Sequence, residues 1–310
     1  MSFPISPVPV GPRLGTAPSS PAVGRRAQRA APRVSERSSL SWPDSPAAFA
    51  PRPVQPATRR EAGWHGPLSP EAQARLYLEI LEESDYAERL APVVGGDHRD
   101  VLDIGAGNGA LSRRCLARPA RWLAVEPNVA MGEALARLRP QLARDGVDLA
   151  HLATTWQGLP ESFCAESVFA FNLGATHHEA GALFDDLVER CRHEMVWVVP
   201  AQYGPSTFCL AGFLPPELHG ADTGPAFERT LAALAREQQP QAIDFVDWQC
   251  RLTFKSRELV VRHFLERLEL ASDSAHGRAV ADYLDYRLGP GGEEARIVCA
   301  KRSAVLRWRF

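Results

Sequence analysis

Two acidic side chains flank a glycine-rich segment, and their spacing is the clearest sign of a binding site in this chain. Asp103 lies near the end of a short apolar run that closes with Ile104, and Gly105, Gly107 and Gly109 follow at alternate positions. Glycines let the backbone turn sharply and approach a ligand where a Cβ atom would clash. Glu126 ends a second apolar run, where a carboxylate can accept hydrogen bonds from both hydroxyls of a ribose. The alternative for Glu126 is a surface acid that caps the next helix.

The charge of Asp103 separates two classes of ligand. A carboxylate attracts an amino group and repels a phosphate, so Asp103 fits a ligand with a positive amino group better than a dinucleotide pyrophosphate. The third glycine also comes one residue earlier than in G-x-G-x-x-G, although Ala110 in the last position of that motif is tolerated. An NAD-dependent oxidoreductase is therefore a less favoured alternative.

A sheet of parallel strands is needed to bring these residues together. Short apolar runs alternate with helical patterns, which is typical of an α/β fold with a parallel sheet covered on both faces. We expect strands at 100–104, 121–125, 148–154, 167–172 and 195–199, and helices at 85–94, 110–117, 129–144 and 180–192. Such sheets bind ligands at the carboxyl ends of their strands.

The pattern changes after residue 200. Residues 201–225 read as a loop with Gly-Pro and Pro-Pro pairs. We expect helices at 227–238, 256–268 and 278–288, and strands at 247–255 and 295–305. The last two strands form a hairpin-like pair that would close the sheet.

Residues 103–109 and 125–128 resemble the first motif and the acidic second motif of the class I S-adenosylmethionine-dependent methyltransferases. The resemblance covers roughly residues 65–310. It implies a Rossmann-like, doubly wound sheet of seven strands, with the last strand antiparallel and with N-terminal cap helices. It also implies S-adenosyl-L-methionine as the cofactor, held by Asp103, Gly105, Gly107, Asn108, Gly109, Glu126, Pro127, Asn128, Met131, Trp156, Gln157 and Asn172.

Within that set, the resemblance assigns different parts of the cofactor to different residues. The methionine part would be contacted by Asp103, Gly105, Gly107 and Asn108. Glu126 would contact the ribose, and Asn128 and Met131 would lie near the adenine. The family often carries an acid after the third strand that meets the adenine amino group. This chain has Thr154 to Pro160 without an acid there, so Gln157 or the Trp156 backbone would substitute.

The acceptor side follows the fourth strand, where the chain reads Asn172 to His178. It lacks the Asn/Asp-Pro-Pro-aromatic tetrapeptide that is typical of methylation of amide or exocyclic nitrogens. A neutral imidazole can take a proton at physiological pH, so His177 or His178 is a candidate catalytic base. One of them could instead cap the next helix. Candidate substrate-lining residues are Tyr203, Phe208, Phe213 and His219, in a lid or insertion at 201–245.

The first 60 residues differ in composition from the rest. They hold 12 of the 26 prolines, nine arginines, no lysine and only two acids, which gives them a net charge of +7 and leaves −9 for the remainder. Their few large apolar residues cannot form a core. We predict a disordered tail at 1–60 and a methyltransferase domain at 61–310. A targeting segment and an upstream extension are alternatives for the tail.

Composition narrows the function class further. The acidic domain lacks a basic platform, which disfavours nucleic acid as a partner, and no apolar run is long enough to span a membrane. The six cysteines show no metal-binding or disulfide spacing, so we expect no metal and a cytoplasmic location. We predict methyl transfer from S-adenosylmethionine to an O, N or S atom of a small molecule, by an enzyme of unknown oligomeric state. A non-catalytic relative that binds the cofactor or a protein partner is the alternative.

Overall fold

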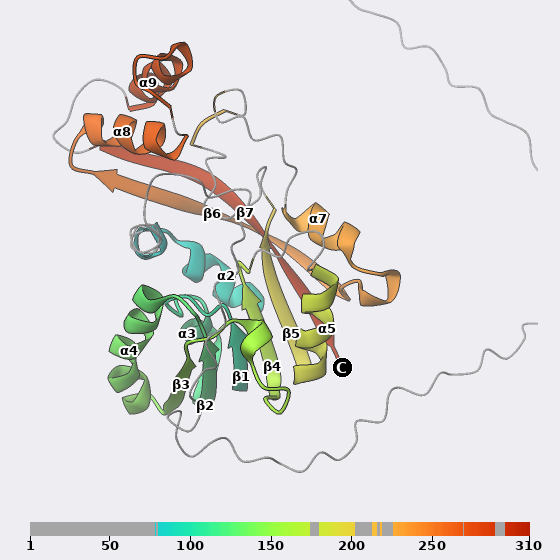
Figure 1. Ribbon diagram of the computed structural model, residues 1–310. Coiled ribbons are helices and arrows are strands. Elements are labelled where there is room, and N and C mark those ends of the chain that lie inside the picture. The colour runs from blue at the N-terminus through green and yellow to red at the C-terminus, as the bar shows by residue number, and fades with distance from the viewer. Residues whose placement is uncertain are drawn as a thin grey trace, which may run out of the picture. The chain divides into compact units, whose positions relative to one another are not determined.

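The computed structural model describes residues 78, 80–173, 180–201, 213–215, 218, 226–268, 270–288 and 295–310 (Figure 1). The expected tail at 1–60 lies outside the described residues, as do the start of the expected N-terminal cap helices, before residue 78, and most of the loop at 201–225. No helix in the described ranges has the length and apolar character needed to cross a membrane.

A seven-stranded sheet forms the centre of the fold, with the strand order β3-β2-β1-β4-β5-β7-β6. The strands β1 to β5 are parallel, and β7 runs antiparallel to both of its neighbours, β5 and β6. This arrangement confirms the predicted doubly wound sheet with an antiparallel last strand. The bounds are β1 His98–Ile104, β2 Leu116–Val125, β3 Val147–Leu152, β4 Ala165–Phe171, β5 Cys191–Pro200, β6 Ala242–Phe254 and β7 Ala295–Arg309.

Helices cover both faces of this sheet. The helices α2 (Tyr86–Val94) and α4 (Val129–Arg144) lie on one face, while α5 (Ala180–Arg190) and α7 (Ala226–Ala233) lie on the other (Figure 1). Central strand residues alternate between two buried clusters, since Val101 packs with α2 and α4 whereas Leu102 packs with α5. Burial on both faces explains why these strands read as continuous apolar runs.

Local signals set several of the helix boundaries. The Asn128 side chain accepts a hydrogen bond from the Met131 backbone N–H (3.2 Å) and begins α4 at the predicted residue. Ser256 caps α8 (Arg257–Arg267) in the same way through Leu259. Such caps satisfy backbone donors that a helix leaves unpaired in its first turn.

The helix predicted at 110–117 is shorter in the structure. The helix α3 (Ser112–Cys115) has four residues, and β2 already begins at Leu116, which pairs with His98 of β1. Leu116 and Ala117 are both buried, so the segment gains more from joining the sheet than from another helical turn. The pairing is interrupted around the cis Arg118–Pro119 bond and resumes at Arg121 opposite Asp100.

The last two strands form a long antiparallel arm. Their pairing runs from Ala242 opposite Arg307 to Phe254 opposite Ala295. The helices α8 and α9 (Ala275–Leu288) pack at the end of the arm away from α7 (Figure 1). Both strands are longer than predicted, and β7 includes the basic and aromatic C-terminal run up to Arg309.

Candidate functional site

The glycine turn lies where β1 ends, at the carboxyl edge of the parallel strands. Gly105, Gly107 and Gly109 have φ angles of +68°, +56° and +68°, which other residues rarely adopt. The N–H groups of Gly105 and Ala106 both donate to the Val125 carbonyl at the end of β2 (2.8 and 3.2 Å). The turn is therefore held against the neighbouring strand end.

Two of these glycines serve different purposes. A Cβ atom on Gly107 would meet no atom of the described residues within 4 Å, so this position borders open space. A Cβ atom on Gly109 would lie 2.3 Å from Cη2 of Trp122. Gly107 thus leaves bare backbone beside open space, whereas Gly109 makes room for a buried indole, a packing role that spacing alone did not reveal.

Asp103 is completely buried beneath the turn. The indole N–H of Trp122 donates to its Oδ2 (3.1 Å), while its Oδ1 has no hydrogen-bond partner among the described residues. Burial raises the pKa of Asp103 to about 7, with a smaller contribution from the charge of Glu126, and the polar side chains of Ser112 and Trp122 oppose the rise. A buried acceptor without a donor is costly, so Asp103 is poised to receive a positively charged hydrogen-bond donor.

Glu126 joins the glycine turn to the end of β2. Its Oε2 accepts from the Gly107 N–H (2.9 Å) and its Oε1 accepts from the Asn128 N–H (2.8 Å). Burial raises the pKa of its carboxyl group, and these two hydrogen bonds oppose the rise. The side chain is 8% exposed, so Glu126 is not a surface acid, and α4 is capped by Asn128 instead.

His151 on β3 is part of this corner and was missed from the sequence. Its Nε2 lies 3.0 Å from the Glu126 carbonyl oxygen. Its ring also lies against Gly132, where a Cβ atom would be 2.6 Å from its Cε1. A polar residue inside an apolar strand was the only signal for it. Because Ala124 and His151 pair directly across β2 and β3, the register places the imidazole beside the acidic corner.

The remaining predicted cofactor residues surround the same edge. Met131 is buried in the first turn of α4, and Pro127 is exposed. Asn108 accepts from the Ala110 N–H (3.1 Å) and shapes the turn. Trp156 is half-buried and Gln157 exposed in the short helix Trp156–Gly158 after β3.

Asn172 follows β4 at the same edge of the sheet. It has a φ of +55°, and its N–H donates to the Val198 carbonyl of β5 (2.9 Å). A positive φ on a residue other than glycine is uncommon and concentrates at functional sites. Its place at the end of β4 is where the acceptor side was expected.

The predicted acceptor residues are only partly covered by the structure. His177, His178, Tyr203, Phe208 and His219 lie outside the described residues. Phe213 is buried and packs edge-to-face on Phe264 (5.8 Å), with the Lys301 ammonium 4.9 Å from its ring centre. Its part in a substrate wall stays a prediction.

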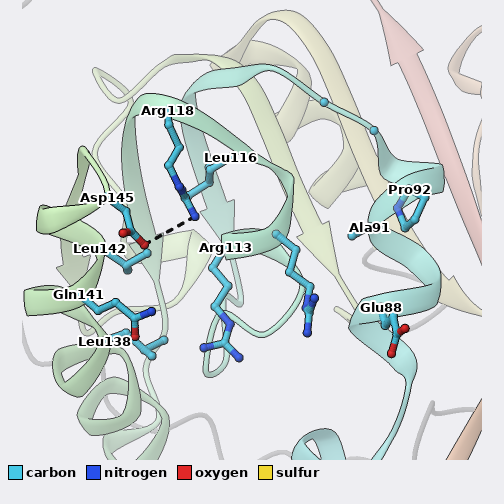
Figure 2. A pocket seen from close by; sticks show the side chains of 13 residues that line it. Glu88, Ala91, Pro92, Arg113, Leu116, Arg118, Leu138, Gln141, Leu142 and Asp145 are labelled. Carbon is cyan, nitrogen blue, oxygen red and sulfur yellow. Dashed lines mark ion pairs between the residues drawn. The ribbon is translucent and has the colours of Figure 1, made fainter.

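A cavity of about 740 Å³ lies between α2 and α4, beside the short α3 (Figure 2). Gly95 and Gly96, which precede β1, and Asp145, which precedes β3, line it, so it belongs to the amino edge of the strands. It contains none of the predicted site residues. Arg113 lines it, and Arg118 lies 3.9 Å from Asp145 there.

Several solved structures are similar to this chain at low sequence identity. No family model and no curated protein sequence matches this chain. A candidate methyltransferase from Bacillus halodurans C-125 has a TM-score of 0.42 at 9% identity, covering 72% of this chain and 97% of its own. Mycolic acid cyclopropane synthase CmaA1 complexed with SAH and CTAB has a TM-score of 0.40 at 12% identity, with coverages of 76% and 84%. Magnesium protoporphyrin IX methyltransferase from Synechocystis PCC 6803 with bound SAH has a TM-score of 0.36 at 13% identity, with coverages of 59% and 83%.

Proposed function

We propose that this chain is an S-adenosylmethionine-dependent methyltransferase that acts on an O, N or S atom of a small molecule. The observation that carries the proposal is the pairing of a buried, half-satisfied carboxylate with a bare glycine backbone. Asp103 Oδ1 has no donor among the described residues, Gly107 borders open space, and Glu126 stands at the neighbouring strand end. A positive amino group, a chain that carries a sulfonium and a ribose fit these three features in that order.

The residues divide the binding task by chemistry. Asp103 would receive the amino group of the cofactor, and ion pairing in this buried setting would be stronger than in water. Glu126 would exchange one or both of its backbone hydrogen bonds for the ribose hydroxyls. When bound, the cofactor supplies an electrophilic methyl group on a sulfonium, and the protein has to align the acceptor with it.

An NAD-dependent oxidoreductase fits the same features poorly. A dinucleotide places its pyrophosphate at the N-terminus of the helix after the glycine turn. Here that helix is α3 with four residues, and the buried carboxylate of Asp103 lies directly before the turn. The short length of α3 and the negative charge of Asp103 both disfavour the binding of a pyrophosphate.

The acceptor side of the proposal rests on sequence. We propose that His177 or His178 removes a proton from the acceptor, and that Tyr203, Phe208 and His219 line its pocket. An acceptor that is already a thiolate or a free amine needs no base. With such an acceptor, substituting both histidines by alanine should leave the turnover rate unchanged. With an alcohol acceptor, the same substitution should abolish turnover.

Calorimetry with S-adenosylmethionine, its demethylated product and NADH tests the proposal. We expect the first two ligands to bind and NADH not to bind. Absence of binding by the folded protein would refute the proposal. A screen of small acceptors with methyl-labelled cofactor then separates an enzyme from a non-catalytic binding protein, which would bind without transferring label.

A further inference from the structure

We propose that Cys250 and Cys299 form a peroxide-reactive dithiol, a modification site at which the pair is oxidised to a disulfide across the β6–β7 arm. The site lies outside the candidate cofactor site and does not depend on the proposed function. The separation of these cysteines by 49 positions gave no sign of it, and only the strand register brings them together.

The register places the two cysteines directly opposite each other. Directly paired residues of antiparallel strands point to the same face, with Cα atoms about 4.5–5.5 Å apart. Disulfides need Cα atoms about 4.4–6.8 Å apart, so the backbone already has a suitable spacing. Neither cysteine is part of a disulfide, and both are buried, with exposed fractions of 0% for Cys250 and 4% for Cys299.

The surroundings favour a thiolate on Cys299. A hydrogen bond from Cys250 is the largest factor that lowers the pKa of Cys299, and the positive charges of Lys301 and Arg287 lower it further against the effect of burial. The pKa is shifted upward in two other cysteines: burial raises the pKa of Cys115 to about 12 and that of Cys191 to about 11. Since the thiolate is the nucleophile, Cys299 is the one expected to react first.

A small peroxide completes the chemistry. The Cys299 thiolate attacks one peroxide oxygen, forming an S–O bond and breaking the O–O bond, and the departing hydroxide takes a proton to become water. The Cys250 sulfur then attacks the sulfenic sulfur of Cys299 as its thiol proton leaves. The S–S bond forms, the S–O bond breaks and a second water departs, so two thiols are oxidised and hydrogen peroxide is reduced.

Peptide mapping after oxidation tests this directly. The full chain is treated while folded with a small excess of hydrogen peroxide, blocked with N-ethylmaleimide and digested without reductant. We expect one linked peptide pair containing Cys250 and Cys299, 2 Da lighter than the sum of the free peptides and released by dithiothreitol. Cys115 and Cys191 should be recovered unlinked and not oxidised.

A displaced pair provides the matched control. In the I297C/C299S variant the second thiol faces Leu252 instead of Cys250, while the number of cysteines, the strand and the face are unchanged. We expect at least about tenfold less linked product, because a diagonal pair exceeds the disulfide spacing. Equal linkage in the variant, or a folded wild-type protein whose Cys250 and Cys299 stay reduced or go only to sulfinic acids, would overturn the proposal.

Discussion

Cofactor affinity should rise with pH because Asp103 must be ionised to hold a positive amino group. Its pKa is raised to about 7 in the unliganded protein by burial, so most copies are neutral at pH 6 and most are ionised at pH 8. If the cofactor binds only the ionised form, affinity is reduced about elevenfold at pH 6 and about 1.1-fold at pH 8. We therefore expect about tenfold tighter binding at pH 8.

The same shift predicts a proton release that calorimetry can measure. Binding at pH 6 should liberate about one proton per cofactor, and binding at pH 8 about 0.1. The number is obtained by repeating the titration in buffers of different ionisation enthalpy. The D103N variant should bind weakly at both pH values and release no proton. H151N serves as the control, since the His151 imidazole contacts the Glu126 carbonyl oxygen and not Asp103, and it should keep the pH dependence.

Stability gives an independent check that needs no ligand. When the pKa of an acid is higher in the folded state than in the unfolded state, the protein loses stability as the pH rises from the unfolded-state pKa to the folded-state pKa. For Asp103 the difference between about 7 and 3.8 corresponds to about 4 kcal/mol as an upper limit. D103N should therefore raise the free energy of unfolding at pH 8 more than at pH 4. Equal effects at both pH values, with pH-independent binding by the wild type, would refute the assigned role of Asp103.

Three substitutions test the rest of the corner. G107V places a branched side chain at a φ of +56° facing open space, so calorimetry should show at least about tenfold weaker cofactor binding. E126A should weaken binding by a similar factor, and unchanged affinity in both variants would contradict the site. G109A should act on stability instead. Its Cβ would overlap Trp122, so urea unfolding should show a loss of about 2–4 kcal/mol; a neutral result would mean that the ring moves aside.

The parts of the fold with strong local signals were predictable from sequence. The helix α4 matches its predicted bounds of 129–144, because Asn128 is an N-cap and the apolar spacing is helical. The start of β2 was not predictable in the same way. Leu111, Cys115 and Leu116 have helical spacing, and only the pairing of Leu116 with His98, a contact between distant positions, draws that residue into the sheet.

In the candidate site too, residues within a local motif could be predicted from sequence, whereas residues brought together by strand register could not. Asp103, Gly107 and Glu126 were found because a motif keeps their spacing within the chain. The indole that holds Asp103 was not found, because Trp122 meets it only through the register of two strands. Asp103 lies opposite Ala124, which puts Trp122 two residues away on the same face. His151 was missed for the same reason, and the acceptor residues still depend on sequence alone.

The short helix α3 has a consequence for local opening of the protein. Between β1 and β2 the described backbone forms the glycine turn and the four-residue α3, with hydrogen bonds such as Arg113 N–H to the Gly109 carbonyl and Arg114 N–H to the Leu111 carbonyl. Amide protons there should exchange through local opening, well before those of β1 and β2. A ligand held by Asp103, Gly107 and Glu126 would tie this segment to both strands. Its measured affinity would then include the free energy of ordering the segment, and slower amide exchange would report that ordering residue by residue.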